Sequence, residues 1–291
     1  MNALRLIAGK TARRRIEEHG LTPELVRLVL GASGGPKWLV LLGLDKLIFG
    51  EWLANSSHQI DLVGSSIGAW RMASVAHPNP KATIEKFIEV YLEMKKEHGK
   101  NAKTFTKVSY DFLEEIYGPD DILAILGNKT RNLNIVTIRA KNLSVTPSAL
   151  RGGAEILASV GANAIDRAHL AKFYERVVFH SGKSVPCPLA WQGFDRKDVK
   201  LRSDTFADAL MASGSIPFMT DAIVNIGGAP TGVYRDGGLV DYHFDVPWRM
   251  ESGIVLYPHF YPHIVPGWFD KKKIKRRAKR RYLGPNADVG S

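Results

Sequence analysis

Residues 60–68 read IDLVGSSIG, a short apolar strand, Ile60 to Val63, that runs directly into a Gly-x-Ser-x-Gly turn. The residues after the turn are compatible with a helix as far as Ala76, where the His-Pro-Asn-Pro sequence at 77–80 stops it. A serine on a sharp strand-to-helix turn projects clear of the sheet. The stretch therefore predicts that Ser66 is presented at the carboxyl end of a strand.

The rest of the chain continues this alternation of strands and helices. An earlier strand at 25–30, LVRLVL, runs into the glycine-rich turn 31–35. Further strands are predicted at 133–138, 176–179, 222–226, 233–235 and 254–257. Helices are predicted at 38–49, which is nearly all apolar and reads as buried, at 81–97, which is amphipathic, and at 204–213.

Strands that alternate with helices indicate βαβ units. The fold class predicted is therefore α/β, with a mainly parallel central sheet covered by helices on both faces. In such sheets, sites gather beyond the carboxyl ends of the strands, where both glycine-rich turns are placed. No internal repeat or long linker interrupts the pattern, so we expect one domain over 1–265 and a C-terminal extension over 266–291.

The composition is that of a globular protein with a sizeable core. The 291 residues are 45% hydrophobic and 24% charged, and the one cysteine, Cys187, excludes an internal disulfide and a four-cysteine metal site. The N-terminus lacks the features of a signal peptide, and no stretch approaches the about 20 apolar residues that span a bilayer. We expect a cytoplasmic location. The histidines at 58, 77, 98 and 169 show no ligand-like pairing, so neither a metal nor a cofactor is expected.

The positive charge is concentrated near the C-terminus. Residues 271–281 read KKKIKRRAKRR, and without these nine basic residues the net charge of +11 falls to +2. Aromatic residues at 268 and 269 precede them, and rings beside cations suit a membrane surface. We therefore expect peripheral contact with the inner face of a membrane through 268–281. A solvated helix or an RNA-binding arm are the alternatives, although no motif for base readout is present.

The turn around Ser66 has the residues that a nucleophile needs. Gly64 and Gly68 permit the close approach of backbone to backbone in a nucleophile elbow. The alternative is a chance match, or a serine that only caps a helix.

A nucleophilic serine also needs donors for the oxyanion that forms when a carbonyl is attacked. Residues 31–38, GASGGPKW, offer glycine amides at a helix start, and Pro36 suits the first turn of that helix. A phosphate-binding loop shares the spacing of Gly31 and Lys37. That interpretation fails because Pro36 removes an amide donor and Trp38 replaces the magnesium-binding hydroxyl.

A late acidic turn, Asp236-Gly237-Gly238, follows the strand predicted at 233–235. Two glycines after an acid let another backbone approach it closely. A plain turn is the alternative, because Asp-Gly is a strong turn signal.

Taken together, these motifs resemble those of patatin-like phospholipases, over about 25–247. That family has a glycine-rich oxyanion loop, a Gly-x-Ser-x-Gly elbow and a late Asp-Gly-Gly turn in this order. The sequence ASGSIP at 212–217 is similar to the family's A-S-x-A-I-P segment. Three positions depart from the family pattern: Ser33 and Trp38 in the loop, and Ser215 in the later segment.

The resemblance implies a three-layer α/β/α fold and a Ser66–Asp236 catalytic dyad without histidine. It implies an oxyanion hole formed by the amides of Gly34, Gly35 and Ile67. Lipid acyl esters are the implied substrates, as for a phospholipase A or lysophospholipase. A thioesterase or an acyltransferase would use the same dyad. Lys37 would orient the loop or counter a substrate phosphate, unless it is only a solvated residue at a helix start.

Two other functions remain open from the residues. A Ser–His–Asp hydrolase would recruit His243, His259 or His263, although an elbow this early in the chain is unusual for that class. A non-catalytic scaffold would bind anionic lipid or RNA through the basic segment, with Ser33 and Trp38 distorting the oxyanion loop. The sequence does not predict the oligomeric state.

Overall fold

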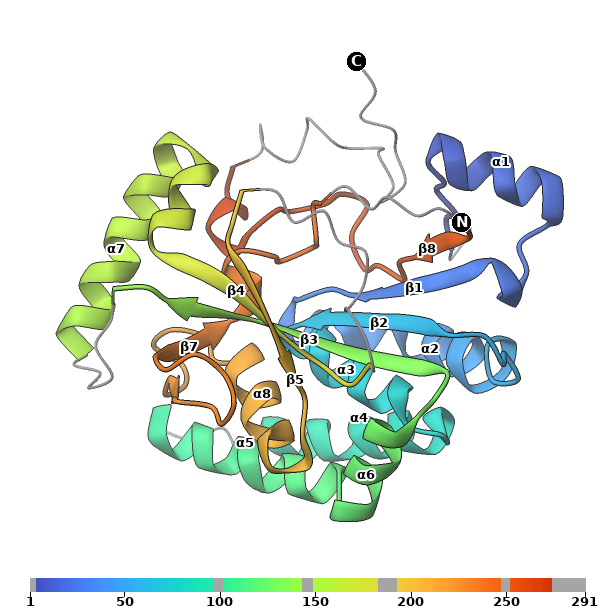
Figure 1. Ribbon diagram of the computed structural model, residues 1–291, viewed down its shortest axis with the longest axis horizontal. Helices are drawn as coiled ribbons and strands as arrows, with labels where there is room; N and C mark the ends of the chain where they lie inside the picture. The colour runs from blue at the N-terminus through green and yellow to red at the C-terminus, as the bar shows by residue number, and fades with distance from the viewer. Residues whose placement is uncertain (1–3, 97–101, 143–148, 183–192, 247–251, 274–291) are drawn as a thin grey trace.

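The computed structural model describes residues 4–96, 102–142, 149–182, 193–246 and 252–273 (Figure 1). Its centre is a mostly parallel sheet with strand order β5-β4-β3-β2-β1-β8, and β7 pairs with both β3 and β6. The strands are β1 Val26–Gly31, β2 Ile60–Ser65, β3 Arg131–Ala140, β4 Tyr174–His180, β5 Arg196–Lys200, β6 Ile223–Val224, β7 Val233–Asp236 and β8 Ile254–Leu256. The α/β class and the mostly parallel sheet predicted from the sequence are confirmed.

Helices lie on both sides of this sheet (Figure 1). On one side are α2 Leu42–Leu47, α3 Ile67–Ala76, α4 Pro80–Lys96, α5 Ala102–Ile116, α6 Pro119–Gly127 and α8 Phe206–Ser213. On the other are α1 Lys10–His19 and α7 Ala149–Ile165, together with C-terminal segments that include the 3-10 turn η7, Trp268–Asp270. The largest core cluster packs between the sheet and the first group of helices, and it includes Val29, Leu62 and Phe87.

The apolar segment 38–49 differs from its prediction. The chain forms a 3-10 helix, η2 Gly35–Leu41, then α2, and then a π-helical turn, η3 Ile48–Trp52. Val40 is 76% exposed and Leu47 is 53% exposed, so the segment is not a buried helix. Its apolar residues are too continuous to show a period, and the sequence therefore did not reveal which side faces water.

Several elements were not predicted. Helices α1, α5, α6 and α7 fall in segments to which the sequence analysis assigned no element, and strand β5 has the highly charged sequence RKDVK. β5 can carry these charges because it is an edge strand that pairs only with β4 among the described strands.

The register of the central strands brings two distant parts of the chain together. β2 runs parallel to β3 and ends where Ser65 is opposite Val136. β7 then pairs with β3 in the antiparallel direction, starting from Thr137 opposite Asp236. β7 therefore takes the place beside β3 that β2 leaves. Ser66, the residue after β2, therefore lies close to Asp236, the last residue of β7.

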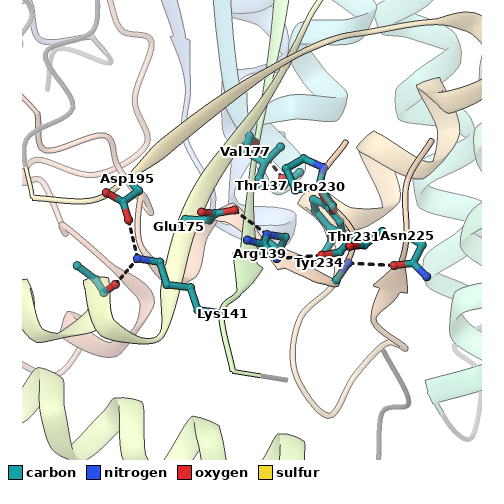
Figure 2. Close-up of polar contacts among 12 residues, drawn as sticks. Thr137, Arg139, Lys141, Glu175, Val177, Asp195, Asn225, Pro230, Thr231 and Tyr234 are labelled. Carbon is teal, nitrogen blue, oxygen red and sulfur yellow. Dashed lines mark hydrogen bonds and ion pairs between the residues drawn. The ribbon is translucent and has the colours of Figure 1, made fainter. Parts of the chain in front are cut away.

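Polar contacts fix this part of β3 between its neighbours (Figure 2). The Thr137 hydroxyl donates to the carbonyl of Val177 in β4, at 2.9 Å. Arg139 forms an ion pair with Glu175 in β4 at 2.6 Å and donates to the carbonyl of Thr231, just before β7, at 2.9 Å. These contacts hold β4 and the approach to β7 on the same strand, so the position of Asp236 depends on β3.

Candidate active site

The turn from β2 to α3 is a strained elbow centred on Ser66. This residue has φ 57° and ψ −135°, a conformation that non-glycine residues adopt at a cost in free energy. The flanking glycines have no room for a side chain: a Cβ on Gly64 would lie 2.4 Å from the carbonyl oxygen of Gly68, and one on Gly68 would lie 2.0 Å from that of Gly31. The close packing of β1, β2 and α3 therefore requires the two elbow glycines that the sequence singled out.

Ser66 and Asp236, which are 170 positions apart in the chain, are joined by a hydrogen bond. The Ser66 hydroxyl donates to Asp236 Oδ2 at 2.7 Å, and each residue is only 6% exposed. The other carboxylate oxygen, Oδ1, accepts from the amide of Gly238 at 2.6 Å. The carboxylate is thus oriented by the backbone of its own turn, with one oxygen directed at the serine.

The aspartate turn is packed as tightly as the elbow. A Cβ on Gly237 would lie 2.3 Å from the carbonyl oxygen of Val136, and one on Gly238 would lie 2.6 Å from Ser33 Oγ. The Asp236 amide donates to the carbonyl of Ser215 at 3.1 Å. Both glycines are needed because strand β3 on one side and the glycine-rich loop on the other approach the turn within contact distance.

Burial changes the acidity of Asp236. Loss of water around the carboxylate raises its pKa to about 6, and the hydrogen bonds from Ser66 and Gly238 and the charge of Lys271 oppose this rise. A carboxylate with a pKa near 6 is a better proton acceptor than an exposed aspartate and is still ionised at neutral pH. The site therefore contains a base suited to removing the serine proton.

The glycine-rich loop is tied to the elbow through Ser33. Its hydroxyl donates to the Ser65 carbonyl at 3.0 Å and lies 3.1 Å from Ser65 Oγ, and its amide donates to the carbonyl of Tyr242 at 3.0 Å. The Ser33 amide is therefore occupied. The departure from the family pattern at this position supplies a contact between the loop and the elbow.

Three amides proposed for the oxyanion hole lie at the starts of two helices. Gly34 precedes η2 and Gly35 begins it, while Ile67 begins α3, which contacts η2. None of these three amides donates to a residue in the described ranges. Helix starts carry partial positive charge and free N–H groups, as an oxyanion hole requires.

The other departure, Trp38, points away from the loop. Its ring is 1% exposed and stacks on Phe87 with centroids 4.8 Å apart, and its edge faces Tyr91. The neighbouring Lys37 directs its ammonium over the ring of Tyr261, 4.9 Å from the centroid. Trp38 thus anchors the loop in the core, while Lys37 remains on the outer side with no ion pair among the described residues.

Ser213 supports the elbow in a way the motif search did not identify. Its hydroxyl accepts a hydrogen bond from the Ser66 amide at 2.9 Å and donates one to the carbonyl of Val136 at 2.7 Å. It ends helix α8 and belongs to the segment ASGSIP at 212–217. The motif at 212–217 marks this segment in the sequence, but only long-range contacts show that Ser213 holds the backbone of Ser66.

Lys271 also lies near Ser66 and Asp236. From the sequence it was assigned only to the basic run at 271–281. Its ammonium lies 4.3 Å from the centroid of Tyr242 and 5.3 Å from that of Trp268. Burial, assisted by the charge of Lys37 and opposed by that of Asp236, lowers the pKa of Lys271 to about 8. The segment assigned to the extension from residue 266 therefore packs against the site through its first residues.

The histidines considered for a catalytic triad lie in an aromatic cluster with Phe260 and Tyr261 that borders the glycine-rich loop. His243 is fully buried and accepts from the Val265 amide, while His259 contacts the backbone of Tyr261. Burial lowers the pKa of His243 well below its ordinary value. In the part of the chain that the structure describes, the side-chain hydrogen bond of Ser66 goes to a carboxylate and not to a histidine.

The described residues also bear on two other kinds of site, a metal centre and a membrane-spanning helix. No group of three or more His, Cys, Asp or Glu side chains there could hold a metal ion. No helix in the same ranges is long and apolar enough to cross a membrane.

The chain was also compared with known proteins. No family model matches it, and the comparisons with curated proteins and with solved structures gave no match. The function is therefore argued from the geometry of the site and from the sequence motifs.

Proposed function

We infer that the protein is a serine acyl hydrolase in which Ser66 is the nucleophile and Asp236 the base. The observation that carries this inference is the 2.7 Å hydrogen bond from a serine on a strained elbow to a buried carboxylate. A serine used only as a helix cap needs neither the strain nor the partner. Backbone strain that is maintained by surrounding contacts is characteristic of functional sites.

The reaction follows from the two groups. As Ser66 Oγ bonds to the acyl carbon, its proton passes to Asp236, and amides of the type found at Gly34, Gly35 and Ile67 hold the carbonyl oxygen. The ester C–O bond then breaks, and Asp236 returns the proton to the leaving alcohol. Water attacks the acyl-enzyme with Asp236 again as base, which releases the acid and restores the serine.

Lipid acyl esters are the substrates we propose, in a three-layer patatin-like fold. The support is the resemblance of the motifs over about 25–247 to patatin-like phospholipases, together with the arrangement of the dyad. Phospholipase A or lysophospholipase activity fits best, and Lys37 would counter a substrate phosphate. A thioesterase or an acyltransferase would require the same dyad and differ in the acceptor.

The test is hydrolysis of a chain-length series of p-nitrophenyl esters, followed by phospholipids and acyl thioesters. Ser66→Ala and Asp236→Asn are each expected to lower kcat/KM by at least about a thousandfold, because residues of a catalytic unit act together. Ser65→Ala is the matched control, since Ser65 lies next to Ser66 but, among the described residues, its hydroxyl accepts a hydrogen bond from Ser33 and forms none with Ser66 or Asp236.

The result that would contradict the proposal is equal turnover by wild type and Ser66→Ala. Turnover that depends on His243, His259 or His263 and not on Asp236 would instead indicate a triad. A folded protein that turns over no ester, thioester or phospholipid would favour a non-catalytic scaffold.

A further inference from the structure

Helix α7 has its apolar side facing water. Leu157 is 73% exposed, Val160 is 44% exposed and Ile165 is 79% exposed. Small residues complete this side, and the exposed ones are Ala154, Ala158, Gly161 and Ala164. Positions 154, 157, 158, 161, 164 and 165 have the spacing of one helix face, and residues 156–165, ILASVGANAI, include no charge.

The two most buried residues in the described part of α7 are polar. The Ser159 hydroxyl contacts the Tyr174 hydroxyl at 2.9 Å, and the Asn163 amide donates to Asp270 at 3.0 Å. Both Ser159 and Asn163 are fully buried. A helix that packs on its own core has the opposite arrangement. The outward apolar residues are thus not explained by packing against the described residues.

Lysine residues lie near the C-terminal end of α7. The Lys273 ammonium donates to the Asn163 carbonyl in α7 at 2.7 Å, and Lys272 is exposed next to it. The basic run of the sequence therefore begins against the helix. An apolar helix face that adjoins Lys residues is the composition of a segment that lies in the interface of a membrane.

The same segment connects α7 to the dyad. Lys271 lies over the ring of Tyr242 at 4.3 Å from its centroid, and the Tyr242 carbonyl accepts the amide of Ser33 in the glycine-rich loop. Two residues further, Lys273 contacts α7. The apolar face, the cations and the candidate active site thus lie along one continuous run of contacts.

We propose that the outward face of α7, with the neighbouring Lys272 and Lys273, docks on an anionic lipid surface. Apolar side chains enter the boundary between headgroups and acyl chains, and the positive charge of this lysine pair, of which Lys272 is exposed, attracts the anionic headgroups. A second copy of the chain fits this face less well, because symmetric pairing would bring two sets of these lysines together. This docking proposal does not depend on which reaction Ser66 and Asp236 perform, so it goes beyond the proposed function.

The test is co-sedimentation of the full chain with vesicles of phosphatidylcholine and phosphatidylserine, compared with phosphatidylcholine alone. We expect binding to the anionic vesicles, and we expect the double variant Leu157→Ser/Ile165→Ser to bind at least about tenfold more weakly. Leu123→Ser is the control, because Leu123 is a 60% exposed leucine on α6, on the other side of the sheet (Figure 1).

The thermal unfolding midpoint of each variant reports whether it folds. Ser66→Ala is expected to bind the vesicles as wild type does, so that loss of catalysis and loss of docking are separate results. The proposal is overturned if wild type does not prefer anionic vesicles, or if the double variant binds as well as Leu123→Ser. It is also overturned if light scattering shows a wild-type dimer that the double variant dissociates, since a second copy would then cover α7.

Discussion

Asp236 is a carboxylate that the fold removes from water and then orients with one backbone amide and one hydroxyl. Burial is the largest influence on its acidity and raises its pKa to about 6. Below this pH the carboxyl carries its own proton and cannot accept one from Ser66. Above it, the base is available. The acidity of this single residue should therefore be visible in the reaction rate.

We predict that kcat/KM for a soluble ester rises with pH and reaches half of its plateau near pH 6. The direction follows because the ionised form is the active one and predominates above the pKa. A pH–rate profile with a short-chain p-nitrophenyl ester measures it. A rate that falls as the pH rises through this range would be inconsistent with a carboxylate base.

Position 238 has no room for a side chain larger than that of glycine. A Cβ there would lie 2.6 Å from Ser33 Oγ and 2.9 Å from Asp236 Oδ1. We predict that Gly238→Ala lowers kcat/KM by about a hundredfold or more, because a displacement of about 1 Å in a catalytic group can cost that much. Gly43→Ala, where the structure has open space, should leave kcat/KM unchanged. Equal rates for the two variants would contradict the assignment of the turn.

Among the elements, the site depends on the contact between α2, which follows the glycine-rich loop, and α3, which follows Ser66. Asp45 in α2 and Arg71 in α3 form a buried pair with two hydrogen bonds of 2.5 Å each. Both residues are at most 1% exposed. This pair links the two helices that follow the glycine-rich loop and the nucleophile.

We predict that Asp45→Asn lowers the free energy of unfolding by about 3–5 kcal/mol, because it leaves the Arg71 charge buried without a counter-ion. The neighbouring Lys46 forms an exposed ion pair with Glu85, and Lys46→Gln should cost less than about 1 kcal/mol. Urea unfolding of both variants measures the difference. Similar losses for the two would show that the buried pair does not join the helices as described.

Local sequence predicted the strands and turns that carry Ser66 and Asp236. It did not predict how distant strands pair, which decides whether these two residues meet. The strands before Ser66 and Asp236 were expected because each short segment runs directly into a glycine-containing turn. That β7 follows β2 along β3 was not predictable, because register between distant strands leaves no local pattern. The sequence likewise did not predict which side of α7 faces the protein, because the inward partners of this helix, Tyr174 and Asp270, lie in other elements.

At the scale of the whole molecule, the sheet joins the two ends of the described chain. β1, near the N-terminus, pairs with β2 on one side and with β8 on the other. The candidate site likewise uses residues from the glycine-rich loop at 33–35 to Lys271. The described part of the predicted extension, 266–273, therefore contacts the site, while 274–291 lie outside the described residues.

We predict that a chain truncated after Ser252 does not unfold cooperatively, because it loses β8 and the segment that packs against α7. A chain truncated after Lys273 keeps all described contacts and should unfold in urea with the midpoint of the full chain. Circular dichroism and tryptophan fluorescence follow both transitions. A cooperative transition at the full-length midpoint for the shorter chain would show that the C-terminal residues are dispensable for the fold.

The central claim is that Ser66 is an activated nucleophile with Asp236 as its partner. The most direct measurement is labelling of the purified full chain with a fluorophosphonate, with the modified residue located by peptide mass spectrometry. We predict a single label on Ser66 that is lost in a folded Asp236→Asn variant. No label on the folded wild type, with or without anionic vesicles, or a label on Ser66 that persists in Asp236→Asn, would contradict it.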